Sequence, residues 1–299
     1  MGKISPFLKN LIQLNIAMVL ISTSGVLGRA INLWPPLTIG LRAILAGLLL
    51  FAFLKWKKIN LKIAKKDRWT ILLGGILFGI HWTAYFQALQ LSTVAIGMLT
   101  IYTYPTWTSI LSPIILKTRF QKIHLLLGLL VIAGIFFLVP EFDFENKYTQ
   151  AVAFGLFSAL AYALRNILMK KQVENYHGSL LMWYQMIIIG VLLLPISVTI
   201  SPTELVDSLP ILLTLALITT ALGHTLFLMT FKHFNITTAS IISSVQPVYG
   251  ILIGLVVLGE VPKVGTVIGG CLILSAVIFE SLRVARIQKK ERLQTAEEN

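Results

Sequence analysis

The sequence predicts an all-α membrane protein with ten transmembrane helices, arranged as two inverted five-helix repeats with both termini in the cytoplasm. Three observations support this prediction: a strongly apolar composition, Lys and Arg residues that alternate between the two ends of ten apolar segments, and short blocks of the first half that recur in the second. Of the 299 residues, 56% are hydrophobic and 12% are charged. That charged fraction is about half the value for a soluble globular domain.

Ten apolar segments account for most of the chain, and a helix needs roughly 20 mostly apolar residues to cross a bilayer. The predicted spans are residues 11–31, 36–54, 70–91, 94–116, 123–139, 152–170, 179–200, 209–231, 239–258 and 264–282. The first is too long for a cleavable signal peptide and lacks a small-residue processing site, so we interpret it as a span. Only Ser92 and Thr93 separate the third span from the fourth, and a single bent helix is the alternative there.

The connecting segments carry the turn and charge signals expected of loops. They include Pro35-Pro36, the basic run KWKKINLKIAKKDR, and the acidic runs PEFDFENK and SPTELVDS. The tenth span continues into a basic tail, RVARIQKKERLQTAEEN. We interpret this tail as a solvated anchor near anionic headgroups.

The distribution of basic residues sets the predicted orientation. With the N-terminus inside, ten crossings place 20 of the 25 Lys and Arg in cytoplasmic segments and only Lys147 and Lys263 outside. Cytoplasmic loops accumulate Lys and Arg, so both termini are predicted to be cytoplasmic. The same loops explain the net charge of +13 without a nucleic-acid partner. Arg29, Arg42 and Arg165 are left at membrane depth.

An internal duplication is suggested by matches at two offsets. With an offset of 136, Ser22 falls on Ser158 and Arg29 falls on Arg165; with an offset of 142, Pro105 falls on Pro247. Each half has five spans, so the second half must enter the membrane from the opposite side. Weak symmetry of this kind is typical of transporters. The predicted repeats are residues 1–145 and 146–299, the second with the basic tail.

The substrate of an inverted-repeat carrier binds near the membrane midplane, often beside interrupted helices. Pro105 and Pro247 lie midway along the fourth and ninth spans, where proline is predicted to kink the helix. His81 lies on the third span and His224 lies within one residue of the equivalent position on the eighth. The predicted substrate-binding residues are Arg42, His81, Tyr85, Tyr102, Pro105, Trp107, Tyr162, His224, Ser244, Gln246, Pro247 and Tyr249.

Structural interpretations of the same residues stay open. The prolines are tolerated in membrane helices, and intramembrane histidines often form hydrogen bonds between helices. Arg29 and Arg165 either extend toward nearby headgroups or mark matching gates at opposite ends of the pathway. Arg42 either pairs with a substrate carboxylate or with helix carbonyl groups. The pairs Gly75 with Gly79, Gly250 with Gly254 and Gly265 with Gly269 have the GxxxG spacing and are expected to mediate packing within the chain.

The chemistry of these residues favours a carrier. Aromatic rings with a few hydroxyl and imidazole groups suit an amphipathic solute, and large apolar or aromatic amino acids fit this description. Nucleosides, sugars and cationic drugs are the alternatives. No acidic residue lies in the middle of a span, so proton coupling would depend on His81 or His224, or the protein is a facilitator.

We expect no catalytic residues, cofactor or metal. A P-loop of the form GxxxxGK[ST] is missing from the sequence, which argues against ATP hydrolysis within the chain. A membrane-embedded enzyme, the remote alternative, would need clustered His, Asp or Glu. Cys271 is the single cysteine, which excludes an internal disulfide. The expected partners are a small-molecule substrate and the lipid bilayer, in a monomer or weak homodimer.

Several motifs in order carry a resemblance to a known family. They are WPPLTIGLRAILAGLLL, YFQAL followed by YTYP, and LGE followed ten residues later by Gly270. Over residues 11–282 the chain resembles the EamA-type family of the drug/metabolite transporter superfamily. The resemblance implies a ten-helix carrier of small metabolites, commonly amino acids and often an exporter, in the bacterial cytoplasmic membrane. Thr118 replaces the family's frequent glutamate, which Glu260 supplies in the second half, and Arg42 has no arginine counterpart near Gln185.

Overall fold

The computed structural model describes residues 6–116, 123–138, 143, 145–234, 236, 239 and 243–297, and these residues form helices and connecting turns without a strand. The first half contains α1 (Pro6–Ala30), α2 (Pro35–Trp56), η1 (Lys65–Asp67), α3 (Arg68–Leu91), α4 (Val94–Ile101), α5 (Tyr104–Leu116) and α6 (Ile123–Leu138). The second half contains α7 (Lys147–Gln172), α8 (Gly178–Ser197), α9 (Pro202–Thr214), η2 (Leu215–His224), α10 (Thr225–Thr230), η3 (Ser243–Val245), α12 (Gln246–Leu258) and α13 (Val264–Glu297). The predicted all-α class is confirmed.

Helix lengths fit a protein that crosses the membrane several times. Six helices of the described chain are long and apolar enough to span a bilayer: residues 8–30, 35–56, 65–91, 147–172, 178–197 and 202–230. Shorter apolar helices cover residues 126–138, 246–258 and 264–276. Every predicted span overlaps one of these helices or a pair of consecutive helices. The number of crossings and the side of each terminus stay predictions.

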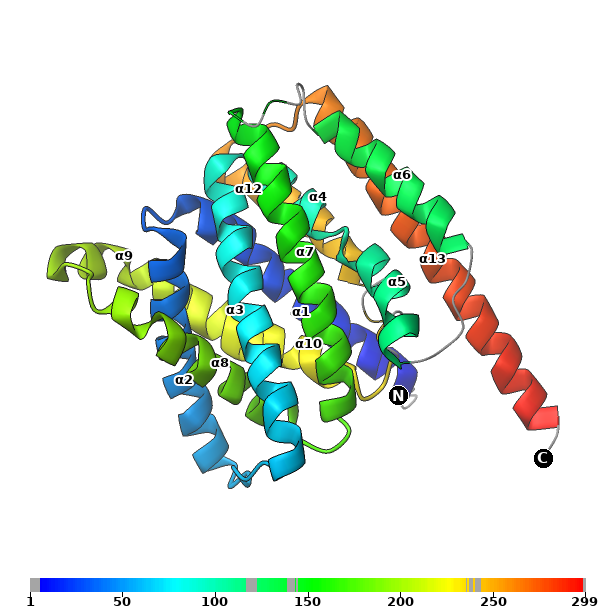
Figure 1. Ribbon diagram of the computed structural model, residues 1–299, viewed down its shortest axis with the longest axis horizontal. Helices are drawn as coiled ribbons and strands as arrows, with labels where there is room; N and C mark the ends of the chain where they lie inside the picture. Colours follow the sequence, from blue (N-terminus) through cyan, green and yellow to red (C-terminus); the bar gives the residue numbers. More distant parts are fainter. Residues whose placement is uncertain are drawn as a thin grey trace, which may run out of the picture.

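The contacts between helices are symmetric with respect to the two halves of the chain. Helix α2 packs on α8, α4 on α12, and α6 on α13, and each pair joins helices at equivalent places in the two halves. The contact between α3 and α7 is matched by that between α1 and η2, while α1 with α12 is matched by α7 with α4. Figure 1 shows α6 and α13 side by side at one edge of the bundle. This pairing is expected of two similar five-span units.

The third and fourth spans are separate helices. Thr93 has an extended backbone (φ −112°, ψ 163°), and its side chain accepts a hydrogen bond from the backbone N–H of Ile96 over 3.3 Å. This is an N-cap, which starts a new helix by satisfying one of its free donors. The alternative of one bent helix over residues 70–116 is therefore wrong.

The fourth and ninth spans are broken rather than kinked. A turn at Tyr102 and Thr103 separates α4 from α5, so Pro105 is the second residue of α5. Similarly, η3 precedes α12, and Pro247 is the second residue of α12. The predicted mid-helix kinks are thus corrected to helix starts. Proline lacks an N–H and disfavours helical backbone at the preceding residue, and it is well tolerated in the first turn.

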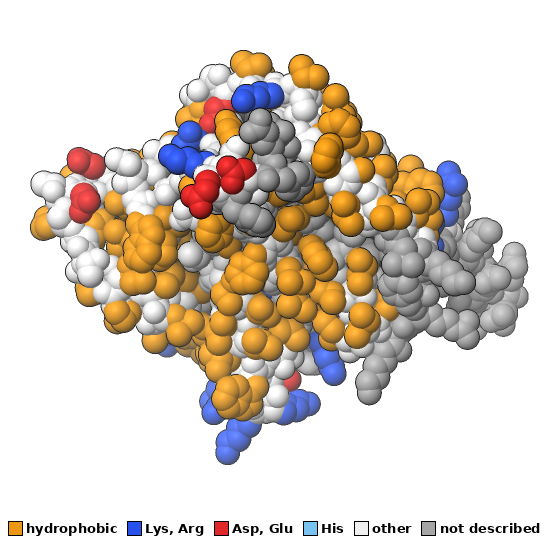
Figure 2. Space-filling view, turned by 45° about the horizontal axis from the view of Figure 1, so that its top comes forward, with side chains coloured by type: hydrophobic (Ala, Val, Ile, Leu, Met, Phe, Trp, Pro, Cys, Tyr) orange, Lys and Arg blue, Asp and Glu red, His pale blue; other side chains and the backbone are white. Residues whose placement is uncertain are grey.

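The surface is organised as expected for a protein in a bilayer. Figure 2 shows hydrophobic side chains across the middle of the visible face, with Lys and Arg at the lower edge, at the right and near the upper edge, and most of the visible Asp and Glu near the upper edge and the left tip. Many large apolar side chains are exposed, among them Leu129, Ile132 and Phe136 of α6. In water such a surface would be costly, whereas lipid chains solvate it.

The three GxxxG pairs mediate packing within the chain, which confirms their predicted role. A Cβ atom at Gly75 would lie 2.7 Å from Ile188 of α8, and one at Gly250 would lie 2.5 Å from Met98 of α4. At Gly269 a Cβ atom would lie 2.5 Å from the carbonyl oxygen of Gly134 in α6. The last contact involves backbone and cannot be relieved by a side-chain rotation.

Replacing Gly269 by alanine is therefore expected to separate α6 from α13. Overpacking of this kind costs about 1–3 kcal/mol, so G269A should lower the unfolding temperature of the protein in detergent. Gly128 of α6 is the matched control, because a Cβ atom there meets nothing within 4 Å. G128A should leave the unfolding temperature unchanged or slightly raised. Equal unfolding temperatures for the two variants would contradict the packing role of Gly269.

Candidate substrate site

A group of aromatic, imidazole and guanidinium side chains is buried where α2, α3, α7 and η2 meet. We call the following residues the central cluster: Arg42, Phe78, His81, Trp82, Tyr162, Arg165 and His224. Each is at most 6% exposed. The cluster therefore combines large apolar faces with polar groups at the centre of the helix bundle.

Arg42 of α2 is fully buried and lies over the ring of Trp82, with its Cζ atom 3.8 Å from the ring centroid. Its Nε donates to Thr220 Oγ1 over 2.6 Å and its Nη2 donates to Thr219 Oγ1 over 2.7 Å. Among the described residues, Arg42 Nη1 has no hydrogen-bond partner. Two of the three guanidinium nitrogens are thus held in place, and the third is free to bind another acceptor.

Arg165 of α7 is also fully buried and lies over Phe78, with its Cζ atom 4.2 Å from the ring centroid. Its Nε donates to Gln185 Oε1 over 2.7 Å and its Nη1 donates to Asn166 Oδ1 over 2.9 Å. Gln185, the position at which the sequence lacks a counterpart of Arg42, is therefore a partner of this second arginine. The expectation that Arg165 extends toward headgroups is wrong, because its side chain is enclosed.

The two guanidinium groups bracket one aromatic pair. Phe78 and Trp82 are one turn apart on α3, and their ring centroids are 4.1 Å apart. Neither Arg42 nor Arg165 forms an ion pair with a carboxylate of the described chain. A buried charge within a membrane is costly unless it is paired. The cluster consequently carries two positive charges that threonine, amide and aromatic groups stabilise only in part.

His81 is oriented by Ser158 of α7. The Ser158 hydroxyl donates to the backbone carbonyl of His81 over 2.8 Å, so its oxygen is left to accept a hydrogen bond from His81 Nδ1 over 2.9 Å. This assignment places the proton on Nδ1 and leaves Nε2 of the neutral ring as an acceptor. The imidazole stacks on Tyr162, with centroids 4.2 Å apart and an interplanar angle of 15°.

His224 ends η2 and lies edge-on to two rings of α3. Its centroid is 5.3 Å from that of Phe78 and 5.2 Å from that of Trp82. Its Nδ1 atom is buried without a hydrogen-bond partner in the part of the chain that the structure describes. The Arg42 guanidinium and the His224 imidazole both adjoin the Trp82 ring, and each group carries one nitrogen without a partner among the described residues.

A second polar contact joins the broken fourth and ninth spans. The Tyr102 hydroxyl donates to Gln246 Oε1, and the hydroxyls of Tyr104 and Ser243 are hydrogen-bonded to each other. Tyr104 lies edge-on to Tyr162, with centroids 4.8 Å apart. The interruptions of the two spans therefore meet each other and adjoin the central cluster through Tyr162.

The remaining predicted residues lie around this centre. Tyr85 is buried, with its ring parallel to that of His81 and 6.3 Å away. Pro105 and Pro247 are buried at their helix starts, and Trp107 and Tyr249 are partly buried at the edge of the main core. Ser244 belongs to η3, and its side chain lies outside the described part of the structure.

Sequence reasoning missed the residues that hold the arginines. Thr219 and Thr220 are consecutive and reach the same guanidinium because residues 215–224 form a π-helix, a rare form that occurs often at functional sites. Both hydroxyls also donate to the carbonyl of Leu215, over 2.6 and 2.8 Å. A threonine pair in an apolar segment gave no distinctive signal, since such residues commonly bond to their own helix.

Arg29 lies in different surroundings from Arg165. It is at the end of α1, and its Nε forms an ion pair with Glu260 Oε1 over 3.1 Å. The other carboxylate oxygen, Glu260 Oε2, accepts a hydrogen bond from the backbone N–H of Val94 over 2.8 Å. Glu260 thus joins the end of α1, the start of α4 and the segment after α12. We call these three residues the end contact; gating by Arg29 or Arg165 stays a prediction.

The described residues contain no group of three or more His, Cys, Asp or Glu placed to hold a metal ion. Cys271 is exposed on α13, away from the cluster. The polar atoms of the cluster are imidazole, guanidinium, amide and hydroxyl groups. This set is suited to hydrogen bonds with an organic anion rather than to coordination of a cation.

Comparisons with known proteins agree with this architecture. The model of the EamA-like transporter family matches residues 8–139 and again residues 149–282. An uncharacterized transporter of Archaeoglobus fulgidus is 26% identical over 233 residues, which are 77% of this chain and 83% of that protein. The threonine/homoserine exporter RhtA of Salmonella typhimurium is 25% identical over 251 residues, 82% of this chain and 81% of the exporter. One crystal structure shares the fold, with a TM-score of 0.69 and 17% identity over 93% of this chain and 98% of that chain.

The fold and the buried polar centre define a multi-pass membrane transport protein built from two helical repeats. More specifically, the chain belongs to the EamA-like transporter family. The resemblance noted in the sequence motifs is therefore confirmed.

Proposed function

We propose that this protein is a secondary transporter that exports amphipathic amino acids across the bacterial cytoplasmic membrane by alternating access. The observation that carries the proposal is the pair of buried guanidinium groups, of which Arg42 keeps one nitrogen free, beside stacked aromatic rings. A bound carboxylate would satisfy that nitrogen in a charge-assisted hydrogen bond. It would also offset part of the buried positive charge.

The rest of an amino acid is matched by the surrounding groups. Its ammonium group would find an acceptor at His81 Nε2, among aromatic rings that attract cations. An apolar or aromatic side chain would lie against the rings of the cluster, which favours large substrates. The relative RhtA is named for threonine and homoserine, so smaller amino acids belong in the same test.

Cationic drugs are disfavoured by the charge of the cluster, because two guanidinium groups would repel them without a described carboxylate to compensate. Nucleosides and sugars lack a carboxylate to pair with Arg42. No lipid-acting enzyme is proposed, because the Ser158 hydroxyl donates to the His81 carbonyl and accepts from His81 Nδ1, so this histidine does not act as a base toward that serine.

Alternating access fits the symmetric contacts of the two halves. The end contact joins three segments that the predicted orientation places at the outer face. At the other end, Lys170 donates to the carbonyl of Phe231 over 2.7 Å, and both residues end predicted spans at the side assigned to the cytoplasm. Contacts at each end thus join segments assigned to a single side, which supports the inverted arrangement with both termini on the same side of the membrane.

The function is tested by counterflow in proteoliposomes. Proteoliposomes that contain the purified protein and are loaded with unlabelled leucine or phenylalanine should accumulate the labelled amino acid in a saturable manner. Threonine and homoserine should compete, while uridine, glucose and a quaternary ammonium drug should not. Failure of every α-amino acid to exchange, with exchange of the cation instead, would overturn the proposal.

The Glu260→Ala substitution is expected to weaken closure of the transport pathway at the end of the protein where the end contact lies. The exposed ion pair and the helix cap together contribute about 1–2 kcal/mol, so their loss should raise the open fraction about 10-fold. The reporter is Val94→Cys in a Cys271→Ala background, since Val94 is 1% exposed beneath the contact. The E260A variant should speed labelling of this cysteine by a membrane-impermeant maleimide.

Glu260→Gln is the matched control, because glutamine keeps an acceptor for the Val94 N–H and loses only the charge. Its labelling rate should fall between those of the parent and E260A. If all three proteins label at one rate, the end contact does not control access.

A further inference from the structure

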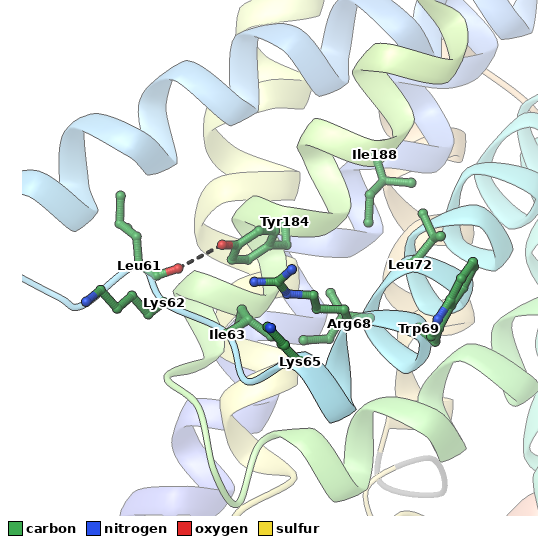
Figure 3. Close-up of a pocket in the computed structure, with 10 residues that line it drawn as sticks. Leu61, Lys62, Ile63, Lys65, Arg68, Trp69, Leu72, Tyr184 and Ile188 are labelled. Carbon is green, nitrogen blue, oxygen red and sulfur yellow. Dashed lines mark hydrogen bonds between the residues drawn. The ribbon is translucent and has the colours of Figure 1, made fainter.

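A cavity of about 970 Å³ lies between the segment that follows α2, the start of α3 and α8. It is distinct from the central cluster, which begins further along α3 at Phe78. Its lining includes the basic residues Lys62, Lys65 and Arg68 and the apolar residues Ile71, Leu72 and Ile188. Figure 3 shows the guanidinium of Arg68 beside Tyr184, with the Lys65 ammonium nearby. The cavity thus joins a basic mouth to an apolar wall.

Two tyrosines from the second half hold this segment in place. The Tyr184 hydroxyl donates to the carbonyl of Leu61 over 2.8 Å. The Tyr176 hydroxyl donates to the Asp67 carboxylate over 2.7 Å and accepts from the Ala64 N–H over 3.1 Å. Asp67 is the single acidic residue of segment 55–68, and it is engaged with Tyr176. The basic side chains that line the cavity form no ion pair with a described carboxylate.

The mouth of the cavity lies at the level of a membrane interface. Trp56 ends α2 and Trp69 is the second residue of α3, and they are 72% and 78% exposed. Exposed tryptophans at helix ends are typical of the headgroup region. Further along, Ile188 of α8 approaches Gly75 of α3, and the neighbouring Leu73 of α3 is 47% exposed. A ligand in this cavity would therefore have its polar end among headgroups and its apolar end among lipid chains.

We propose that this cavity binds an anionic phospholipid, with the phosphate beside Lys65 and Arg68, Lys62 at the rim of the mouth, and one acyl chain along Leu72 and Ile188. Basic pockets between transmembrane helices recognise such headgroups. The charge of the mouth selects an anionic over a zwitterionic headgroup, and the apolar wall selects a lipid over a free phosphate ester. On the proposed orientation, the lipid comes from the cytoplasmic leaflet.

The test is native mass spectrometry of the full chain released from neutral detergent. Phosphatidylglycerol and phosphatidylcholine with identical acyl chains are added separately, and glycerol phosphate serves as the headgroup without chains. The protein should bind phosphatidylglycerol in preference to the other two. The triple variant K62Q/K65Q/R68Q should bind phosphatidylglycerol about 100-fold more weakly, given the usual contribution of each basic residue at a membrane surface.

The matched control is K57Q/K58Q/K66Q, which removes the same charge from exposed residues of the same segment that do not line the cavity. It should retain most of the phosphatidylglycerol binding. If both triple variants lost phosphatidylglycerol binding equally, the binding would depend on general surface charge, and the proposed lipid site would be wrong. Binding of glycerol phosphate as tight as that of the lipid would overturn the role of the apolar wall. Because binding is measured directly, neither result depends on the transported substrate.

Discussion

Replacing Arg42 by methionine is expected to weaken binding of carboxylate substrates about 10- to 100-fold, the value of one hydrogen bond to a charged group. The reason is the free Nη1 atom of a guanidinium that is otherwise fixed by Thr219 and Thr220. The measurement is substrate affinity by thermal shift and half-saturation in counterflow.

The fold should tolerate this change. A buried charge exchanged for an apolar side chain of similar size is often neutral or stabilising. The threonine hydroxyls keep their hydrogen bonds to Leu215, so R42M leaves no donor unpaired there. The unfolding temperature should stay equal or rise while transport falls. A protein that loses stability and keeps its substrate affinity would identify Arg42 as a structural residue.

Three controls sharpen the test. An amino acid amide lacks the carboxylate, so its binding should be the same in R42M and the parent. Arg165→Met should behave differently, because it leaves the amide oxygens of Gln185 and Asn166 without their donor. That variant is expected to lose stability by about 1–3 kcal/mol as well as transport. The Arg42→Lys variant should bind carboxylate substrates little better than R42M, since an ammonium group cannot reproduce the planar geometry of the guanidinium.

Replacing His81 by alanine is expected to impair transport about 10- to 100-fold while the protein stays folded and inserted. The assigned role is acceptance of a hydrogen bond from the substrate ammonium at Nε2, a charge-assisted contact of that magnitude. The readout is the rate of counterflow, with elution profile and unfolding temperature as measures of folding.

Asparagine at position 81 separates the two roles of this histidine. Its side-chain amide can donate to Ser158 as Nδ1 does, but nothing takes the place of Nε2. H81N should therefore regain the stability lost in H81A and stay defective in transport. If H81N transports like the parent, the hydrogen bond to Ser158 is what matters and His81 leaves the proposed substrate site.

The sequence predicted the helices of this protein well because the signals are local. Apolar runs, loop prolines and basic segments mark where each helix begins and ends, and the two matches of the family model cover nearly the same residues as the predicted halves. Predictions failed where a tertiary contact decides the backbone. Pro105 and Pro247 indicated bends, but each is the second residue of a helix, and the turn before α5 contacts the start of α12 through the hydrogen bond from Tyr102 to Gln246.

The candidate site was predicted in part. Four of the predicted residues belong to the central cluster: Arg42, His81, Tyr162 and His224. Their presence there was predictable because polar side chains in membrane helices usually face the interior of the bundle. The partners that orient them could not be predicted. Arg42 donates hydrogen bonds to Thr219 and Thr220, which lie 177 and 178 positions further along the chain. Nothing in the local sequence pattern distinguishes these two threonines from the others.

What the sequence alone determined is a membrane protein of apolar helices in two similar halves, since hydrophobicity and charge are properties that each segment carries by itself. The tertiary structure decided which polar groups are paired and which stay free. It pairs Arg29 with the carboxylate of Glu260, 231 positions away, and leaves Arg42 without a carboxylate partner among the described residues. That difference arises because the partners of both arginines come from distant parts of the chain. Which groups meet depends on how helices from the two halves approach one another, and a local sequence pattern does not specify that approach.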